Sequence, residues 1–403
     1  MVDKELAKKS GIVFTGSVMS QSFGLLFMIL ATRILSKSDY GYFSYIISMG
    51  TFFATIVSGG FSIAVTRYIA MDSTKEKKYI ENGLLGITLL FIIASTASVI
   101  IFWPYWEIIV VIFPFSLINF YLGILRGKEK FKIYSLVASG RNLFKLIFLL
   151  IAMFLGIVTK EVLVWIYALA GIFIVFFVEY VYNIKLLSKP KYDPTIFREL
   201  LIFSIPLIIM TTSYSLTNNI GIYLLNLKVG KEAVASYKNA LLLQAVYGFV
   251  SGAVGVVLLP KISSTKSFKN ITKTLRDSII FMLSLEVLIF IVSLFIGKQV
   301  IILLFSQKYA DVFPLFIIMS FGTFAYSIER AAFSSFWNGI GMPNITMISS
   351  ISAGVLVTLF SLLFIPIYGI TGATYGYSIG FILAVLFVDF TFFIYYRTNR
   401  KFK

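Results

Sequence analysis

Long apolar runs dominate the chain, and short polar or Pro/Gly-containing breaks separate them. A helix needs roughly 20 apolar residues to cross about 30 Å of hydrocarbon, so windows of that length are the units to search for. Twelve such windows fit, at approximately residues 11–34, 41–66, 80–102, 105–125, 132–157, 162–184, 199–226, 234–259, 274–297, 312–338, 345–366 and 369–396. The pattern therefore predicts an all-α membrane protein with twelve transmembrane helices and no separate soluble domain.

The basic residues occupy alternate gaps between these predicted helices. Most of the 35 Lys and Arg residues lie at the N-terminus, in the second, fourth, sixth and eighth gaps, and in the C-terminal tail, whereas the other gaps are nearly uncharged. Because cytoplasmic loops carry the excess of Lys and Arg, we expect both termini in the cytoplasm and the protein in the cell membrane. The run from Trp103 to Trp106 is typical of an aromatic anchor at the outer face.

The composition narrows the chemistry. Neither cysteine nor histidine occurs among the 403 residues, which excludes disulfides, thiolate nucleophiles, imidazole bases and the usual zinc or haem sites. No ATP-binding loop is recognisable, so any energy input would come from an ion gradient or the substrate gradient. The net charge of +17 belongs mostly to the cytoplasmic gaps and fits anionic lipid headgroups, not nucleic acid. We expect no cofactor, no metal site and no enzymatic activity.

The second half of the chain repeats the pattern of the first. The second predicted span aligns without gaps on the eighth and places Arg67 on Lys261. The stretch that begins at Gly127, before the fifth span, aligns on the one that begins at Gly341, before the eleventh. Six spans per half is an even number, so both halves are predicted to enter the membrane from the same side, as a parallel repeat.

The joint between the halves is a basic stretch with two prolines, from Lys185 to Leu200. We therefore predict an N-terminal six-helix bundle over residues 1–184, a cytoplasmic linker over 185–198 and a C-terminal six-helix bundle over 199–403.

Two cations lie where lipid-facing charges are costly. Arg141 and Lys145 occur about ten and fourteen residues into the fifth predicted span, so at ~1.5 Å per residue Arg141 is about 15 Å deep. An Arg or Lys at a helix centre costs roughly 2.5 to 3.5 kcal/mol on insertion scales, and these two lie four residues apart on one face. The repeat supplies no matching cation, because Val355 and Leu359 take the aligned positions. We interpret the pair as lining a hydrated cavity for an anionic ligand.

The alternative interpretation is a set of structural ion pairs. Glu286, Glu329 and Glu179 are candidate partners for the two cations, and pairing would neutralise them. Glu329 and Arg330 are adjacent and point about 100° apart on a regular helix, so both cannot serve one site. Arg330 is the third candidate to bind an anionic ligand.

Four carboxylates are candidates for coupling to an H+ or Na+ gradient. Glu286 lies alone among apolar residues of the ninth span, either as a titrating group or as the partner of a cation. Glu329 is the second candidate. Glu179 and Asp389 align in the repeat, near the cytoplasmic ends of spans six and twelve, where a shared structural role is the other interpretation.

Several further polar residues have two interpretations each. Asn218 and Asn219 offer hydrogen-bonding groups for sugar hydroxyls, or for neighbouring helices. Arg33, Arg67 and Lys261 lie near the ends of spans, where they can contact a substrate or act in a gate, or simply extend to the lipid headgroups.

Glycines at four-residue spacing predict close helix contacts. Gly372, Gly376 and Gly380 form such a series in the twelfth span, and Gly248 and Gly252 form a shorter one in the eighth.

The order of several motifs resembles that of a known family. They are ATRILSKSDYGYFSYIISMGTFFATIVSGGFSIAVTRYIA from Ala31, ILRGKEKFK from Ile124, LNLKVGKEAVASYKNA from Leu225 and WNGIGMPNITM from Trp337. They are similar to stretches of polysaccharide-exporting flippases in the multidrug/oligosaccharidyl-lipid/polysaccharide superfamily, and the resemblance covers essentially the whole chain. It implies outward translocation of an oligosaccharide linked to a polyprenyl pyrophosphate.

The chain departs from the family at one place. Many relatives carry an Asp-Arg pair in span seven, where this sequence reads Asn219-Ile220-Gly221-Ile222. Any role of that pair cannot be carried over.

Three classes of function compete. A flippase for lipid-linked oligosaccharide predicts a cationic cavity, short loops and two parallel halves. A multidrug or small-molecule antiporter of the same superfamily predicts an acid-lined cavity. A membrane glycosyltransferase or polymerase would need a large outer loop with carboxylates, and the outer gaps are short. We predict the flippase, acting as a monomer, with Arg141 and Lys145 as the main binding residues.

Overall fold

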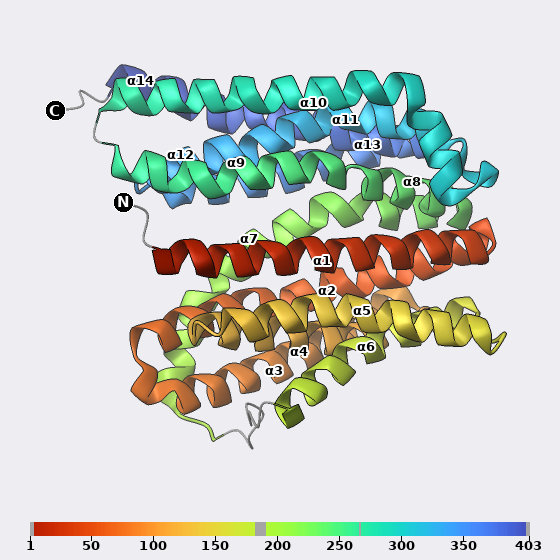
Figure 1. Ribbon diagram of the computed structural model, residues 1–403, viewed down its shortest axis with the longest axis horizontal. Coiled ribbons are helices and arrows are strands. Elements are labelled where there is room, and N and C mark those ends of the chain that lie inside the picture. The colour runs from red at the N-terminus through yellow and green to blue at the C-terminus, as the bar shows by residue number, and fades with distance from the viewer. Residues whose placement is uncertain (1–3, 182–190, 266, 400–403) are drawn as a thin grey trace. The chain divides into compact units, whose positions relative to one another are not determined.

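The computed structural model describes residues 4–181, 191–265 and 267–399, which form helices joined by short turns, without β-strands (Figure 1). Contacts divide the chain into two compact units, Met1–Thr212 and Ser213–Lys403. In the described residues, eleven helices are long and apolar enough to cross a membrane. The all-α membrane fold predicted from the hydropathy pattern is therefore confirmed.

The first unit consists of helices α1 to α6 and the first part of α7 (Figure 1). Their bounds are α1 Lys4–Ile34, α2 Lys37–Met71, η1 Ser73–Lys75, α3 Glu76–Phe102, α4 Ile108–Gly127, α5 Phe131–Phe154, α6 Lys160–Val181 and α7 Pro194–Lys228. Helix α2 packs most extensively on α4, and α1 on α5. Between α2 and α4, the Ser62 hydroxyl donates to the Asn119 carbonyl at 2.7 Å, and the Thr66 hydroxyl donates to the Gly123 carbonyl at 2.8 Å. Such small and hydroxyl-bearing residues let membrane helices approach closely.

Helix α7 begins with a side-chain cap. The Asp193 carboxylate accepts the backbone N–H groups of Thr195 and Ile196 at 3.2 and 3.3 Å, which satisfies donors that have no partner inside the helix. The Lys78 ammonium of α3 pairs with the same carboxylate at 3.2 Å and ties the start of α7 to the first unit.

The division between the units falls inside α7, between Thr212 and Ser213. The physical reason is close packing of the first part of α7 on α2, where a Cβ added at Gly59 would collide with Thr211. The predicted linker spans 185–198, and its residues 185–190 lie outside the described residues.

The second unit contains the rest of α7 and the remaining helices. Their bounds are α8 Lys231–Leu243, α9 Ala245–Ser264, α10 Phe268–Phe305, η2 Gln307–Tyr309, α11 Val312–Ser327, η3 Ile328–Phe333, α12 Ser334–Gly339, α13 Pro343–Ala384, η4 Val385–Phe390 and α14 Thr391–Asn399. The segments η3 and η4 are π-helical. Helix α11 packs on α13, and α9 packs on α12 and η3.

Helix α13 reverses direction at Gly369, whose φ of 57° and ψ of −129° are not helical. After the reversal, Gly372, Gly376 and Gly380 lie directly against the earlier arm, because a Cβ at any of them would collide with residues 357–364. The predicted close approach at these three glycines is confirmed. The two arms correspond to the last two predicted spans, which accounts for twelve predicted spans against eleven helices.

The predicted close approach at Gly248 and Gly252 is wrong. No heavy atom of the described residues lies within 4 Å of a Cβ placed on either glycine. Four-residue spacing puts small residues on one face of a helix, but it does not place a partner opposite that face.

Candidate functional site

Arg141 and Lys145 of α5 contact one aromatic surface. The Lys145 Nζ atom lies 3.4 Å from the centroid of the Tyr167 ring, and the Arg141 Cζ atom lies 4.8 Å from the centroid of the Phe115 ring. The two rings come from α6 and α4 and are stacked, with centroids 5.4 Å apart and planes 3° apart. We call these four side chains the cation cradle.

The cradle has an inner and an outer cation. Lys145 is only 2% exposed, whereas Arg141 is half-buried. Phe27 of α1 and Phe43 of α2 extend the aromatic wall, each with its ring centroid 6.1 Å from that of Tyr167. Four helices besides α5 thus fix the position of the two charges.

No carboxylate of the first unit neutralises the cradle, as far as its described residues go. Neither Arg141 nor Lys145 lies within ion-pair distance of an Asp or Glu there. Glu179, one of the predicted partners, interacts with Tyr121. The Arg141 Nε atom is buried without a hydrogen-bond partner in the described part of the chain.

The balance of energies favours an anion at this place. A cation over an aromatic face gains about 0.5 to 2 kcal/mol. Removing an ammonium or guanidinium from water costs several kcal/mol even after relaxation, and two like charges on one helix face add repulsion. The rings alone do not offset these costs, and a bound phosphate would add charge-assisted hydrogen bonds to both cations.

Arg330 of η3 lies on a second aromatic surface, in the second unit. Its Cζ atom is 4.8 Å from the centroid of the Tyr214 ring, and the residue is exposed. The Tyr214 hydroxyl is hydrogen-bonded to the Tyr326 hydroxyl, and the two rings stack with centroids 5.9 Å apart. The two predicted cations of the first unit therefore share a site, and the third has aromatic neighbours of its own.

Asp389 and Glu329 come together in the second unit. The Asp389 carboxylate is fully buried and accepts two hydrogen bonds, from the Trp337 indole N–H at 3.0 Å and from the Ser349 hydroxyl at 2.7 Å. Glu329 is close enough to interact electrostatically with Asp389. We call Glu329, Asp389, Trp337 and Ser349 the acid cluster.

Both carboxylates of the acid cluster lie on π-helical segments, η3 and η4. Such segments are rare and are frequent at functional sites, because they shift side chains out of regular α-helical register. Glu329 and Arg330 have different neighbours, as their adjacency in the sequence predicts.

Glu286 of α10 is an isolated carboxylate. It is fully buried, and neither carboxyl oxygen has a hydrogen-bond partner among the described residues. Tyr247 and Ser327 are polar groups close enough to interact with it electrostatically. A cation or a proton would satisfy this carboxylate.

The two asparagines of α7 use their amide groups locally. Asn218 donates to the Tyr214 carbonyl at 3.4 Å, and Asn219 donates to the Ser215 carbonyl at 2.8 Å. Their roles toward a sugar stay a prediction.

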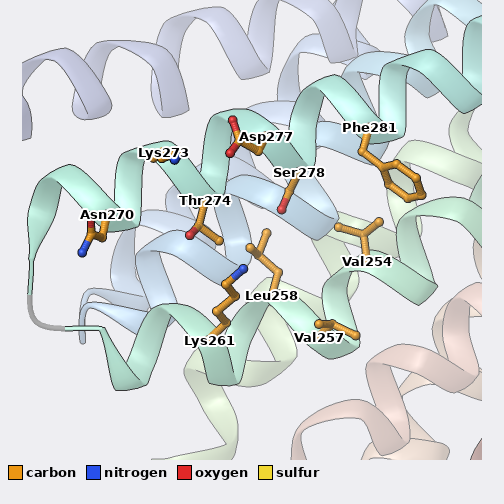
Figure 2. A pocket seen from close by; sticks show the side chains of 10 residues that line it. All are labelled: Val254, Val257, Leu258, Lys261, Asn270, Lys273, Thr274, Asp277, Ser278 and Phe281. Atoms are coloured by element: carbon orange, nitrogen blue, oxygen red, sulfur yellow. The ribbon is translucent and has the colours of Figure 1, made fainter.

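The three cations predicted near the ends of spans are all exposed. Arg33 lies in the last turn of α1. The Arg67 Cζ atom lies 4.5 Å from the centroid of the Phe203 ring of α7. Lys261 lines a groove between α9 and α10 (Figure 2).

Sequence reasoning missed the partners of the charged groups. Phe115, Tyr167 and Trp337 lie inside long apolar runs, and with 41 phenylalanines and 23 tyrosines in the chain no single ring stands out. Only the packing of α4 and α6 against α5 reveals the cradle, and only the fold of the second unit brings Trp337 to Asp389.

Comparison with known proteins assigns the fold and the family. Residues 6–266 match the family model described as polysaccharide biosynthesis protein. The capsular polysaccharide biosynthesis protein CapF of Staphylococcus aureus is 24% identical over 399 residues, covering 94% of this chain and 98% of CapF. The membrane protein MJ1068 of Methanocaldococcus jannaschii is 27% identical over 413 residues, covering 90% and 80%.

Solved transporter structures share the fold. The lipid II flippase MurJ, in an inward closed conformation, has a TM-score of 0.76 at 18% identity, covering 96% of this chain and 93% of MurJ. A multidrug resistance MATE family transporter of the MOP superfamily, in an inward-facing conformation, has a TM-score of 0.69 at 16% identity, covering 95% of both chains. At these identities the likeness concerns the fold alone.

Proposed function

Because the chain belongs to the polysaccharide biosynthesis protein family, we propose that it is a flippase that moves lipid-linked oligosaccharide across the cell membrane. The observation that carries this proposal is the cation cradle, two buried or half-buried cations whose neighbours are aromatic rings. A polyprenyl-pyrophosphate headgroup is anionic and polar, so it needs such a site to leave water. The lipid tail stays in the bilayer.

Arg141 is the first contact for the pyrophosphate in this proposal. Its guanidinium rests on Phe115 and can offer parallel N–H groups to two phosphate oxygens. Lys145 lies deeper, and its charge acts across a medium of low dielectric, where attraction to an anion is stronger than in water. The site would be exposed alternately to the two sides of the membrane. Arg330 is a further candidate contact.

The proposal includes an ion gradient as the energy source. The acid cluster and Glu286 are the candidate sites for H+ or Na+, since both bury carboxyl groups in the second unit. Glu179 is the remaining candidate. The positive-inside pattern supports cytoplasmic termini, and single cysteines at Ser73 and Thr159 test this in the cysteine-free chain. Only the Thr159 variant should react with an impermeant thiol reagent in intact cells.

A multidrug antiporter is the second candidate function, and the buried carboxylates of the second unit favour it. Such a protein would bind cations, so Arg141→Glu should then improve drug export. In the flippase, the same substitution should abolish transport.

The decisive experiment measures flipping and folding in the same variants. Arg141→Ala should abolish flipping of lipid-linked oligosaccharide in reconstituted vesicles, and Arg141→Lys should retain part of it, because an ammonium lacks the planar fork. The folded amount and the thermal stability should not fall. Arg198→Ala, at an exposed arginine of the same unit, is the matched control.

A different outcome would identify a structural ion pair. In that case Arg141→Ala would reduce the amount of folded protein. A second, neutral substitution at Glu179, Glu286 or Glu329 would then restore both the protein level and transport, and this result would overturn the proposal.

A further inference from the structure

A groove of about 670 Å³ lies between α9 and α10 of the second unit. Figure 2 shows Lys261 of α9 and Asn270 and Lys273 of α10 toward one end, and Phe281 and Val254 toward the other. Asp277 and Ser278 lie between the charged and the apolar end. The groove is therefore amphipathic along its length.

The length of α10 places this gradient relative to the membrane. The helix has 38 residues, which at 1.5 Å per residue span about 57 Å, whereas the hydrocarbon is about 30 Å thick. Four charged residues, Lys269, Lys273, Arg276 and Asp277, lie within its first eleven residues, and the apolar run begins at Ile279. The charged end of the groove thus lies at headgroup level, and Phe281, eight residues after Lys273, lies about 12 Å further along α10, at the depth of acyl chains.

A second groove flanks the same end of α10. It has a volume of about 920 Å³ and shares Asn270 and Lys273 with the first. It adds three cations, Lys269, Arg276 and Arg397, and its lining also includes Phe333, Phe390 and Phe393.

The two grooves at the N-terminal end of α10 are lined mainly by positive charges. Asp277 is the one carboxylate among the residues that line the two grooves, and Arg276 already pairs with it at 3.0 Å. Lys273 makes no ion pair in the part of the chain that the structure describes. Four other cations line these grooves with it.

We propose that the α9–α10 groove binds one anionic membrane phospholipid, with its phosphate at Lys273 and Lys261 and an acyl chain along Leu258, Val254 and Phe281. The chemistry matches at both ends, since clustered lysines at a membrane surface attract anionic headgroups and the apolar walls accept a chain. Such a lipid would be a resident ligand of the second unit, apart from the substrate of the cation cradle.

The experiment measures lipid binding to the purified full-length chain in detergent, by native mass spectrometry with added phosphatidylglycerol. We expect one phosphatidylglycerol to be retained in preference to phosphatidylcholine. Lys273→Gln should weaken its binding about fivefold, which is the worth of one basic residue near an anionic surface. Lys298→Gln, an exposed lysine nearer the other end of the same helix, is the matched control and should bind as the unchanged protein does.

The outcomes separate this proposal from its alternatives. Equal retention of phosphatidylcholine, or equal loss in both lysine variants, would overturn it. Displacement of the lipid by inorganic phosphate at the same concentration would reveal a phosphate site without a chain, and tighter binding of a polyprenyl phosphate would assign the groove to the substrate carrier. Because Arg141→Ala should bind phosphatidylglycerol normally, failure of the flippase proposal leaves this test intact.

Discussion

The cation cradle of the first unit and the acid cluster of the second bury opposite charges, and they satisfy them differently. Lys145 is 2% exposed and rests on the Tyr167 ring. Asp389 is fully buried and accepts hydrogen bonds from Trp337 and Ser349. The acid is therefore held by donors of the protein, whereas the cation has only weak aromatic partners among the described residues of its unit. The difference supports our proposal of a ligand at the cradle and of a small-ion site at the cluster.

The same comparison holds at equivalent positions of the repeat. Val355 and Leu359 align with the two cations of the cradle, and they are 60% and 47% exposed. The helix face that carries buried charge in the first unit thus carries exposed apolar side chains in the second. The positions that the sequence alignment pairs therefore do not share the charge of the cradle.

Removal of the Asp389 carboxylate should have the largest effect on stability. Asp389→Ala removes the acceptor of the buried Trp337 N–H and one acceptor of the Ser349 hydroxyl, which should lower the free energy of unfolding by about 2 to 4 kcal/mol. Asp389→Asn keeps an acceptor for Trp337 and should cost less than about 1 kcal/mol. Unfolding in detergent with urea or SDS measures both, and equal effects would show that the hydrogen bonds do not hold the cluster.

Removal of a cation from the cradle should raise the free energy of unfolding, whereas removal of the Asp389 carboxylate should lower it. Lys145→Leu removes a buried charge that has no carboxylate partner in the described part of its unit, so we expect unfolding to become harder by about 1 to 3 kcal/mol while flipping is lost. Lys132→Leu, at an exposed position of α5, is the control and should change stability little. A less stable Lys145→Leu would mean that the charge is paired, and the comparison would fail.

The helices were predictable because each depends on a long apolar run, a property of consecutive residues. The reversal near Gly369 and the contacts of Gly372 to Gly380 were predictable too, since glycine spacing is local. The spacing of Gly248 and Gly252 gave the same signal and no contact, because a partner helix is not encoded in the helix itself.

The site was predictable only in its charges. Arg141 and Lys145 stand out because a charge in an apolar run is costly wherever the helix packs. Their aromatic neighbours and the Trp337–Asp389 hydrogen bond depend on which helices meet, and apolar runs of similar composition do not specify this. The π-helical segments had no sequence signal that we recognised.

The turns at Gly156 and Gly369 test whether helices that the sequence alignment pairs end in the same backbone conformation. Gly156 and Gly369 end corresponding helices of the repeat, and both have positive φ, at 68° and 57°, with no atom within 4 Å of an added Cβ. Alanine at Gly156 should cost about 1 to 2 kcal/mol of unfolding free energy through backbone strain alone. Alanine at Gly369 should cost more, because its ψ of −129° lies outside the left-handed helical region and is tolerated almost only by glycine. Gly248→Ala is the control, because it lies within a helix in open space and should stabilise slightly. An equal or smaller cost at Gly369 would show that its backbone conformation is not what reverses α13.

The smallest effect on stability should come from Glu286→Gln. This variant tests whether a buried acid of the second unit binds the coupling ion. Glutamine has nearly the same shape, and the carboxyl oxygens it replaces have no hydrogen-bond partner among the described residues, so unfolding should change by less than about 0.5 kcal/mol. If Glu286 binds the coupling ion, transport should lose its dependence on pH or sodium. Glu199→Gln, at an exposed carboxylate of the first unit, is the control and should keep that dependence. Transport that responds to both gradients as before would exclude Glu286 and leave the acid cluster and Glu179 as the ion sites to test.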